Sequence, residues 1–439
     1  MFNWLFARHM GGKFLLRIED TDRARSTQPA IDAIISSMKW LGLDWDDEVV
    51  YQFARSQRHA EIAHQLLAEG KAYYCYETAE ELQEKRAAAQ ALSKVYKYDR
   101  KWRDSSEKPP AGVKPSIRIK APLSGETIIR DEVQGDVVIK NSELDDMVIL
   151  RSDGTPTYML AVVVDDRDMA VTHIIRGDDH LTNSARQMII YDAMGWKVPI
   201  FAHIPLIHGS DGAKLSKRHG ALGVEAYRDM GYLPEALCNY LLRLGWGHGD
   251  DEIISREQAI KWFDISSIGK AAARFDFDKL NNLNGHYIRA ADDERLVELV
   301  APILFGNNSG GNGIMEKLKK AMPSLKERAK TIIELAKSAE FYIARPEPDE
   351  KAKKLLAEGK EIIGKIIRVI ESAKWEAKEI EAKVKEFLAE NNLKPGAVFP
   401  AIRAALTGSA SSPGGIFEIM EILGRQESLE RLVSAALPG

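Results

Sequence analysis

Residues 171–207 read VTHIIRGDDHLTNSARQMIIYDAMGWKVPIFAHIPLI, and this stretch indicates the fold class. The apolar runs VTHIIRG and FAHIPLI each have the length and composition of a short buried strand. Between them, the segment from Arg186 to Gly195 has the pattern of a helix that ends at a glycine. The apolar run TYMLAVVVDD at 157–166 is predicted as one more strand. Strands that alternate with helices are typical of an α/β fold with a parallel sheet.

The same pattern is present near the start of the chain, and it changes further on. KFLLRIEDTD at 13–22 is predicted as a buried strand that ends in carboxylates, and AIDAIISSMKWLGL as a helix that stops near Gly42. From about 112 to 150, short β-rich runs alternate with Gly, Pro and Asn. These runs predict an inserted module that contains β-strands.

The last third of the chain is predicted to be helical. EIEAKVKEFLAENN places Ile380, Val384, Phe387 and Leu388 on one face of a helix. Two segments rich in Gly and Ser, at 306–313 and 407–415, are predicted as loops.

Composition limits the possible classes of protein. With 439 residues, 45% hydrophobic and 29% charged, the chain has the composition of a soluble globular protein of two or three domains. Cys75 and Cys238 form no CxxC pair, which is typical of a reducing cytosol and argues against a structural zinc. No apolar run approaches the roughly 20 residues of a membrane span, and the N-terminus lacks the pattern of a secretion signal. The net charge of −4 means that any nucleic-acid surface must come from local segregation of charge.

The stretch GAKLSKRHG at 212–220 concentrates cations in a loop bounded by glycines. Such a run is often only a solvated surface turn. This one follows the predicted strand FAHIPLI, and ligands bind at the carboxyl ends of strands in open α/β sheets. The position therefore favours a ligand-binding loop over a plain surface turn.

Four motifs in this order identify a family. They are LRIEDTDRARS (16–26), DGTPTYMLAVVVDDRDMAVTHIIRGDDHLTN (153–183), KLSKRHG (214–220) and GYLPEALCNYLLRLGW (231–246). With them the chain resembles the bacterial-type glutamyl-tRNA synthetases, which are class I aminoacyl-tRNA synthetases, most clearly between residues 14 and 288.

The resemblance implies a domain organisation. It predicts an α/β Rossmann-like class I catalytic domain with an inserted α+β module, followed by an all-α anticodon-binding domain. The expected parts are two pieces of the catalytic domain at 1–75 and 153–224, the acceptor-binding module at 76–152, a helical stem-contact region at 225–288, and the anticodon-binding domain at 289–439.

The activity that the resemblance implies is ATP-dependent activation of L-glutamate to glutamyl-adenylate and transfer to the 3′ end of tRNA(Glu). In this reading KLSKR is the variant of the family's KMSKS loop, and Lys217 and Lys214 are the catalytic cations. Flexible ammonium groups suit this role, because negative charge builds up on phosphate oxygens as pyrophosphate leaves. Ile207 and Asp179 complete the expected ATP site, and the alternative for Asp179 is a cap of the helix that follows it.

Three residues match the family's glutamate site. Glu19 would bind the substrate ammonium group, Arg176 one of the two substrate carboxylates, and Tyr158 would orient the substrate side chain. A guanidinium fork binds a carboxylate in bidentate geometry, which supports Arg176 on chemical grounds. The structural alternatives are a helix cap or surface ion pair for Glu19 and a core position for Tyr158.

The chain also departs from the family pattern. It begins at MFNWLFARHMGG, which resembles the helix after the family's HIGH motif, and contains no HIGH segment. The alternative function is therefore a truncated, catalytically impaired fragment that binds tRNA, and this alternative predicts weak glutamate activation. A glutamyl-queuosine synthetase is disfavoured because that group lacks the helical domain. We expect Mg²⁺ to accompany ATP, no zinc, a cytoplasmic location and a monomer.

Overall fold

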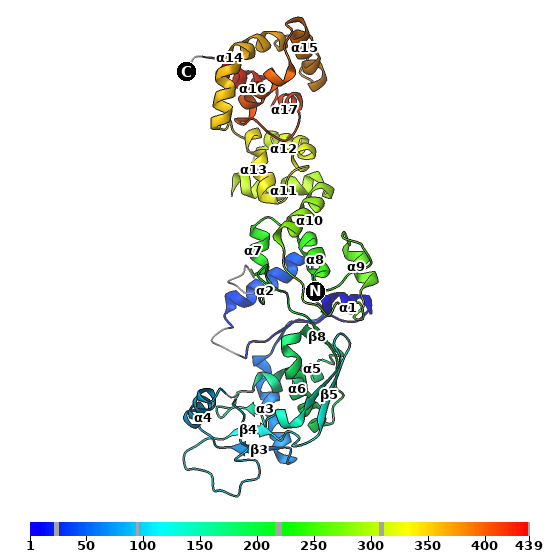
Figure 1. Cartoon of the computed structure of the whole chain (residues 1–439), viewed down its shortest axis with the longest axis vertical. Coiled ribbons are helices and arrows are strands. Elements are labelled where there is room, and N and C mark those ends of the chain that lie inside the picture. Colours follow the sequence, from blue (N-terminus) through cyan, green and yellow to red (C-terminus); the bar gives the residue numbers. More distant parts are fainter. Residues whose placement is uncertain (22–25, 94–95, 216–221, 307–310, 438–439) are drawn as a thin grey trace. The chain divides into compact units, whose positions relative to one another are not determined.

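The computed structural model describes residues 1–21, 26–93, 96–215, 222–306 and 311–437 (Figure 1). The chain divides into two compact units. Unit 1 comprises Met1–Ala221 and Cys238–Phe275, and unit 2 comprises Leu222–Leu237 and Asp276–Gly439. Each unit is described by itself.

Unit 1 combines helices and strands. Its strands are β1 (Arg17–Ile18), β2 (Val50–Tyr51), β3 (Ala72–Cys75), β4 (Ser116–Ile119), β5 (Glu126–Asp131), β6 (Gly135–Lys140), β7 (Val148–Leu150), β8 (His173–Gly177) and β9 (Ile200–Ile204). Its α-helices are α1 (Phe2–His9), α2 (Gln28–Leu41), α3 (Ser56–Ala68), α4 (Ala79–Ala91), α5 (Tyr158–Asp168), α6 (Leu181–Met194) and α9 (Arg256–Trp262), and α8 (Pro234–Arg243) spans the boundary with unit 2.

The strands of unit 1 form three sheets. The largest has the order β6-β5-β9-β8, in which β5, β9 and β8 run parallel and β6 is antiparallel to β5. An antiparallel sheet has the order β3-β4-β7, and β1 pairs with β2 in parallel. In the largest sheet, Arg176 of β8 is in register with His203 of β9, and Asp131 of β5 is in register with Phe201. The carboxyl ends of β8 and β9 are level with each other, whereas β5 ends level with Phe201, near the start of β9.

Helix α5 corrects the sequence prediction, which placed a strand at 157–166. The helix begins after Thr157 and is buried continuously from Leu160 to Asp166. An unbroken apolar run has neither the period of a half-buried strand nor that of an amphipathic helix, so its pattern could not distinguish a buried strand from a buried helix. Helix α5 packs against α3 and α6.

The other elements predicted in unit 1 are present. Strands β8 and β9 lie where VTHIIRG and FAHIPLI predicted them, and α2 and α6 end at Gly42 and Gly195, both in the left-handed conformation with φ of 66° and 63°. Glycine adopts this conformation without the strain that a Cβ atom causes. Helix α6 begins at Leu181, before the predicted Arg186, and β1 is shorter than predicted.

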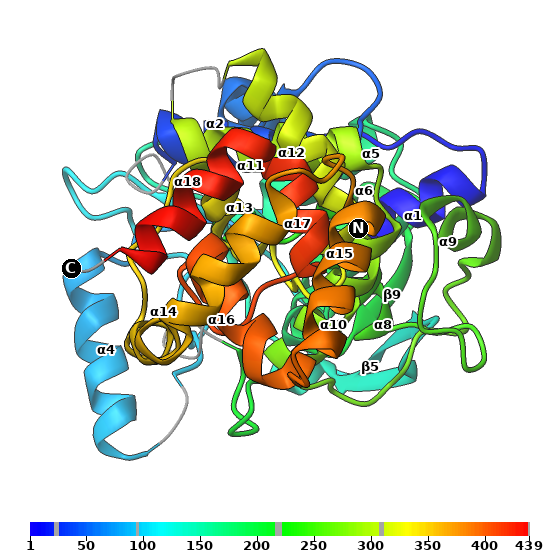
Figure 2. The ribbon, with the colours of Figure 1, turned by 90° about the horizontal axis from the view of Figure 1, so that it is seen from above.

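Unit 2 is helical throughout its described residues. Its α-helices are α7 (Val224–Asp229), α10 (Phe277–Ala290), α11 (Asp293–Phe305), α12 (Asn312–Leu325), α13 (Ile332–Ala339), α14 (Glu350–Ile370), α15 (Ala377–Glu390), α16 (Pro395–Thr407), α17 (Ile416–Leu423) and α18 (Arg425–Ala436). Helices α14, α16 and α18 pack against one another (Figure 2).

The predicted stripe on α15 is confirmed. Ile380, Val384 and Leu388 are buried in the core of unit 2, and Phe387 packs against that core. The predicted loop at 407–415 lies between α16 and α17. Of the loop predicted at 306–313, residues 307–310 lie outside the described part of the chain.

Candidate active site

The side chain of Arg176 is held by neutral groups at the end of β8. Its Nε–H donates to Nε2 of His203 at 3.1 Å, and one terminal nitrogen donates to Oγ of Ser184 at 2.5 Å and to Oε1 of Gln187 at 2.8 Å. Among the described residues, no carboxylate lies within ion-pair distance of this guanidinium. Burial lowers the pKa of Arg176, and nearby Tyr158, Asp166 and Glu19 oppose that shift. The cation is therefore oriented but not neutralised, which suits the binding of an external carboxylate.

Tyr158 begins α5 beside this guanidinium. Its ring meets the ring of His180 edge-on, with 6.2 Å between the centroids. Burial raises the pKa of Tyr158, the charge of Glu19 raises it further, and Arg176 opposes both. Tyr158, Arg176 and Glu19 are thus close enough to interact electrostatically. The structure brings together the three residues that the sequence proposed for glutamate.

Glu19 follows β1 and keeps its carboxylate accessible. Its side chain is 42% exposed and accepts a hydrogen bond from Arg17 at 3.3 Å. Arg17 also forms an ion pair of 2.8 Å with Asp166 on α5, where both side chains are largely buried. This buried pair fixes the end of β1 against α5. The neighbouring Asp20 is buried and accepts the backbone N–H of Phe53, which gives it a structural contact.

The residues proposed for ATP form a second group. Nζ of Lys214 lies 2.8 Å from Oδ2 of Asp179, and the backbone N–H of Leu215 donates to the carbonyl of Ile207 at 2.9 Å. The hydrogen bond from Lys214 lowers the pKa of Asp179. Lys214, Asp179 and Ile207 are therefore neighbours. Lys217, with the rest of 216–221, lies outside the described residues.

The sequence did not single out several residues that surround Arg176. Ser184, Gln187 and Tyr191 project from α6 with helical spacing of three and four residues, so they share one face. Nε2 of Gln187 and the hydroxyl of Tyr191 are buried and have no hydrogen-bond partner within the described structure. Two unsatisfied polar atoms near a cation are consistent with a polar ligand site. The spacing of three and four residues between these polar side chains in LTNSARQMIIY could have indicated that they share a helix face.

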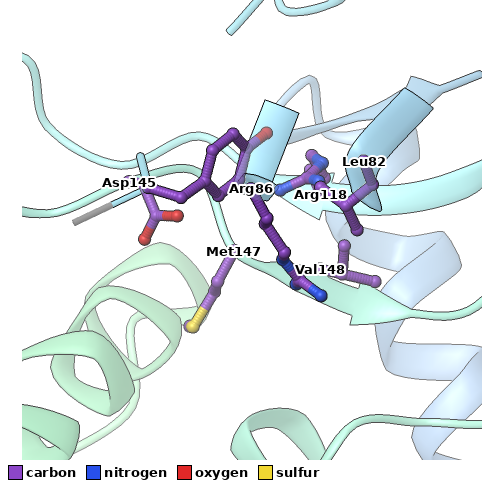
Figure 3. A pocket seen from close by; sticks show the side chains of 7 residues that line it. Leu82, Arg86, Arg118, Asp145, Met147 and Val148 are labelled. Carbon is purple, nitrogen blue, oxygen red and sulfur yellow. The ribbon is translucent and has the colours of Figure 1, made fainter. Parts of the chain in front are cut away.

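A cavity of about 460 Å³ lies near the sheet β3-β4-β7 (Figure 3). It is lined by Leu82, Arg86, Tyr96, Arg118, Asp145, Met147 and Val148. None of the predicted site residues lines it. Arg118 is already engaged, because it stacks on the ring of Tyr98 at 3.7 Å and donates to Sγ of Cys75 and to the carbonyl of Asp146. Within the described ranges, no group of three or more His, Cys, Asp or Glu could hold a metal ion.

Comparisons with known proteins agree with this organisation. The catalytic domain of class I tRNA synthetases (E and Q) matches residues 1–282, and the anticodon-binding domain matches residues 295–436. The combination defines a class I synthetase.

Full-length similarities narrow the class. The chain is 58% identical to the glutamate–tRNA ligase of Nitrobacter hamburgensis over 100% of the chain and 95% of that protein. It is 56% identical to glutamate–tRNA ligase 2 of Parvibaculum lavamentivorans over 99% of the chain and 90% of that protein. A crystal structure of a glutamate tRNA ligase from Elizabethkingia meningosepticum in complex with its amino acid has a TM-score of 0.89 and 31% identity, and covers 99% of this chain and 94% of that one. The chain therefore belongs to the glutamate–tRNA ligase family.

This result confirms the predicted fold class and the resemblance to the glutamyl-tRNA synthetases. The match of a catalytic-domain family to residues 1–282 favours the ligase over the alternative of a tRNA-binding fragment. Among the helices that the structure describes, none combines the length and apolar character that a membrane span needs.

Proposed function

We propose that the group around Arg176 binds L-glutamate for ATP-dependent activation and transfer to tRNA(Glu). The observation that carries this proposal is the guanidinium of Arg176, which is held by neutral acceptors beside Tyr158 and Glu19. A substrate carboxylate would supply the missing counter-charge. Bidentate binding would use Nη1 together with Nη2, in place of one of the bonds from Nη2 to Ser184 and Gln187. Glu19 would accept hydrogen bonds from the substrate ammonium group, and Tyr158 would orient the side chain.

The chemical step that we propose is the activation of glutamate by ATP. An oxygen of the α-carboxylate of glutamate attacks the α-phosphorus of ATP, the bond to the β-phosphate oxygen breaks, and pyrophosphate leaves with the electron pair. Lys217 and Lys214 would stabilise the negative charge that develops on the phosphate oxygens. Lys214 is 59% exposed on its side chain, so its ammonium group can exchange Asp179 for a phosphate. We expect Ile207 and Asp179 to border the nucleotide.

Cofactors and partners follow from the same reading. Mg²⁺ would enter with the ATP phosphates, which are its usual ligands in such sites. We expect no zinc, because Sγ of Cys75 already contacts Arg118 and Tyr98. We propose that residues 76–152 contact the acceptor end of tRNA, that 225–288 contact its stem and that 289–439 read its anticodon. We expect the protein to act as a monomer in the cytoplasm.

A charging assay tests this function. Labelled L-glutamate should become acid-precipitable only when ATP and tRNA(Glu) are both present. A parallel reaction with tRNA(Gln) determines whether that tRNA is also a substrate. Preference for labelled glutamine over glutamate, or incorporation that does not require ATP, would contradict the proposal.

A further inference from the structure

Arg176 is linked to a buried carboxylate through one histidine. Asp131, His203 and Arg176 lie at the carboxyl ends of β5, β9 and β8, the three adjacent parallel strands. Oδ2 of Asp131 is 2.6 Å from Nδ1 of His203, and Nε of Arg176 is 3.1 Å from Nε2 of the same ring. Asp131 and His203 are both buried. The three side chains form a continuous chain of hydrogen bonds.

The contacts of His203 indicate which of its ring nitrogens accepts a hydrogen bond. The Nε–H of Arg176 can only donate, so Nε2 of His203 must present its lone pair. The ring proton then lies on Nδ1, where it is donated to Asp131. Oγ of Ser184 also lies 3.0 Å from Nε2, so its hydroxyl can donate to the same lone pair. These contacts together place the ring hydrogen on Nδ1, toward Asp131.

Asp131 is well suited to hold this tautomer. Its carboxylate also accepts the backbone N–H groups of Val133, Gln134 and His203, at 2.8 to 3.1 Å. A carboxylate fixed by three backbone groups cannot rotate away from the imidazole. The strand that carries it comes from the β-rich segment, whereas β8 and β9 follow α5 in the chain.

We propose that His203 and Asp131 are positioning residues for substrate recognition, acting through Arg176. The proposal rests on the assignment of Arg176 to a glutamate carboxylate. By holding Nε, His203 fixes the plane of the guanidinium and directs the other edge toward the substrate. Ser184 and Gln187 hold one terminal nitrogen of the guanidinium, and the imidazole of His203 holds Nε as the second fixed point. Two fixed nitrogens determine the orientation of the guanidinium plane. Loss of this point should weaken glutamate binding while leaving ATP binding unchanged.

A double-mutant cycle tests whether His203 acts through Arg176. The measured quantities are dissociation constants for labelled L-glutamate and for ATP, by equilibrium dialysis of the full chain. We expect His203→Leu to weaken glutamate binding about tenfold and ATP binding less than twofold. In an Arg176→Gln background the same change should have less than a twofold effect on glutamate. His203→Gln, whose amide oxygen can accept from Nε of Arg176, should recover most of the affinity.

Two controls separate positioning from general damage. His173→Leu replaces histidine by leucine at the start of β8, away from the hydrogen bonds that join Asp131, His203 and Arg176. It should leave the dissociation constants for glutamate and ATP unchanged. Asp131→Asn keeps a similar volume but removes the charge that holds the tautomer, and should weaken glutamate binding severalfold. It also serves as the test variant if His203→Leu fails to fold.

The outcomes distinguish the two proposals. If Arg176→Gln weakens glutamate binding but the His203 and Asp131 variants do not, or if His203→Leu has the same effect in both backgrounds, the positioning role is wrong and the glutamate site stands. If Arg176→Gln leaves glutamate binding unchanged, the assignment of Arg176 is wrong and the positioning role falls with it.

Discussion

Replacing Arg176 by glutamine should weaken glutamate binding by a factor of about 10² to 10⁴. The amide nitrogen of glutamine reaches only the position of Nε, so it can still donate to His203, but glutamine lacks the charge and the terminal nitrogens of the guanidinium. A hydrogen bond to a charged group contributes about 1.5–3 kcal/mol. Losing two such bonds to a carboxylate costs about 3–6 kcal/mol, and each 1.4 kcal/mol is about tenfold in affinity.

The assay is equilibrium dialysis with labelled glutamate, with the melting temperature of each variant as a check on folding. Arg176→Lys keeps the charge but not the planar fork, so we expect an intermediate loss of about tenfold. Arg167→Gln is the matched control, because Arg167 is exposed on α5. Unchanged glutamate affinity in a folded Arg176→Gln variant would refute the assignment of Arg176 as the carboxylate reader.

Three further predictions concern stability and catalysis. Asp166→Asn removes the nearer of the two carboxylates that pair with the buried Arg17 and leaves only Glu19 at 3.3 Å, so the free energy of unfolding in urea should fall by about 2 kcal/mol, against about 1 kcal/mol or less for the more exposed Asp168→Asn. Burial alone would raise the pKa of Asp131, but hydrogen bonds from His203 and backbone N–H groups lower it to about 2 from 3.8. The ionised Asp131 should therefore contribute about 2 kcal/mol to the free energy of unfolding above pH 4, and this contribution should be lost as the pH falls through 2. The difference in free energy of unfolding between wild type and Asp131→Asn should become smaller from pH 7 to pH 2. An equal difference at both pH values would contradict this prediction. Lys217→Ala should lower the rate of adenylate formation by about 10², the scale of one preorganised charge, with glutamate affinity little changed, and an unaltered pyrophosphate-exchange rate would exclude the role of the KLSKR loop.

The sequence was most informative where a local pattern has one physical solution. Gly42 and Gly195 marked helix ends because only a left-handed residue closes those turns without strain. Arg176 and Lys214 stood out as cations placed just after predicted strands. The run at 157–166 was predicted wrongly because full burial removes the alternation of apolar and polar residues by which strand and helix differ.

Contacts between distant strands could not be read from the chain. Asp131 and His203 are 72 residues apart, and their contact depends on the register of β5 against β9. No local pattern determines that register. Helical spacing could have predicted that Ser184, Gln187 and Tyr191 share one face of α6. This would have required a predicted helix that begins before Arg186.

The most direct test of the account is a crystal structure of this protein with L-glutamate bound. We predict one substrate carboxylate within about 3.2 Å of two guanidinium nitrogens of Arg176, the ammonium group within hydrogen-bond distance of Glu19, and the hydroxyl of Tyr158 near the substrate side chain. Glutamate bound elsewhere, or bound here with its carboxylates turned away from Arg176, would contradict the account.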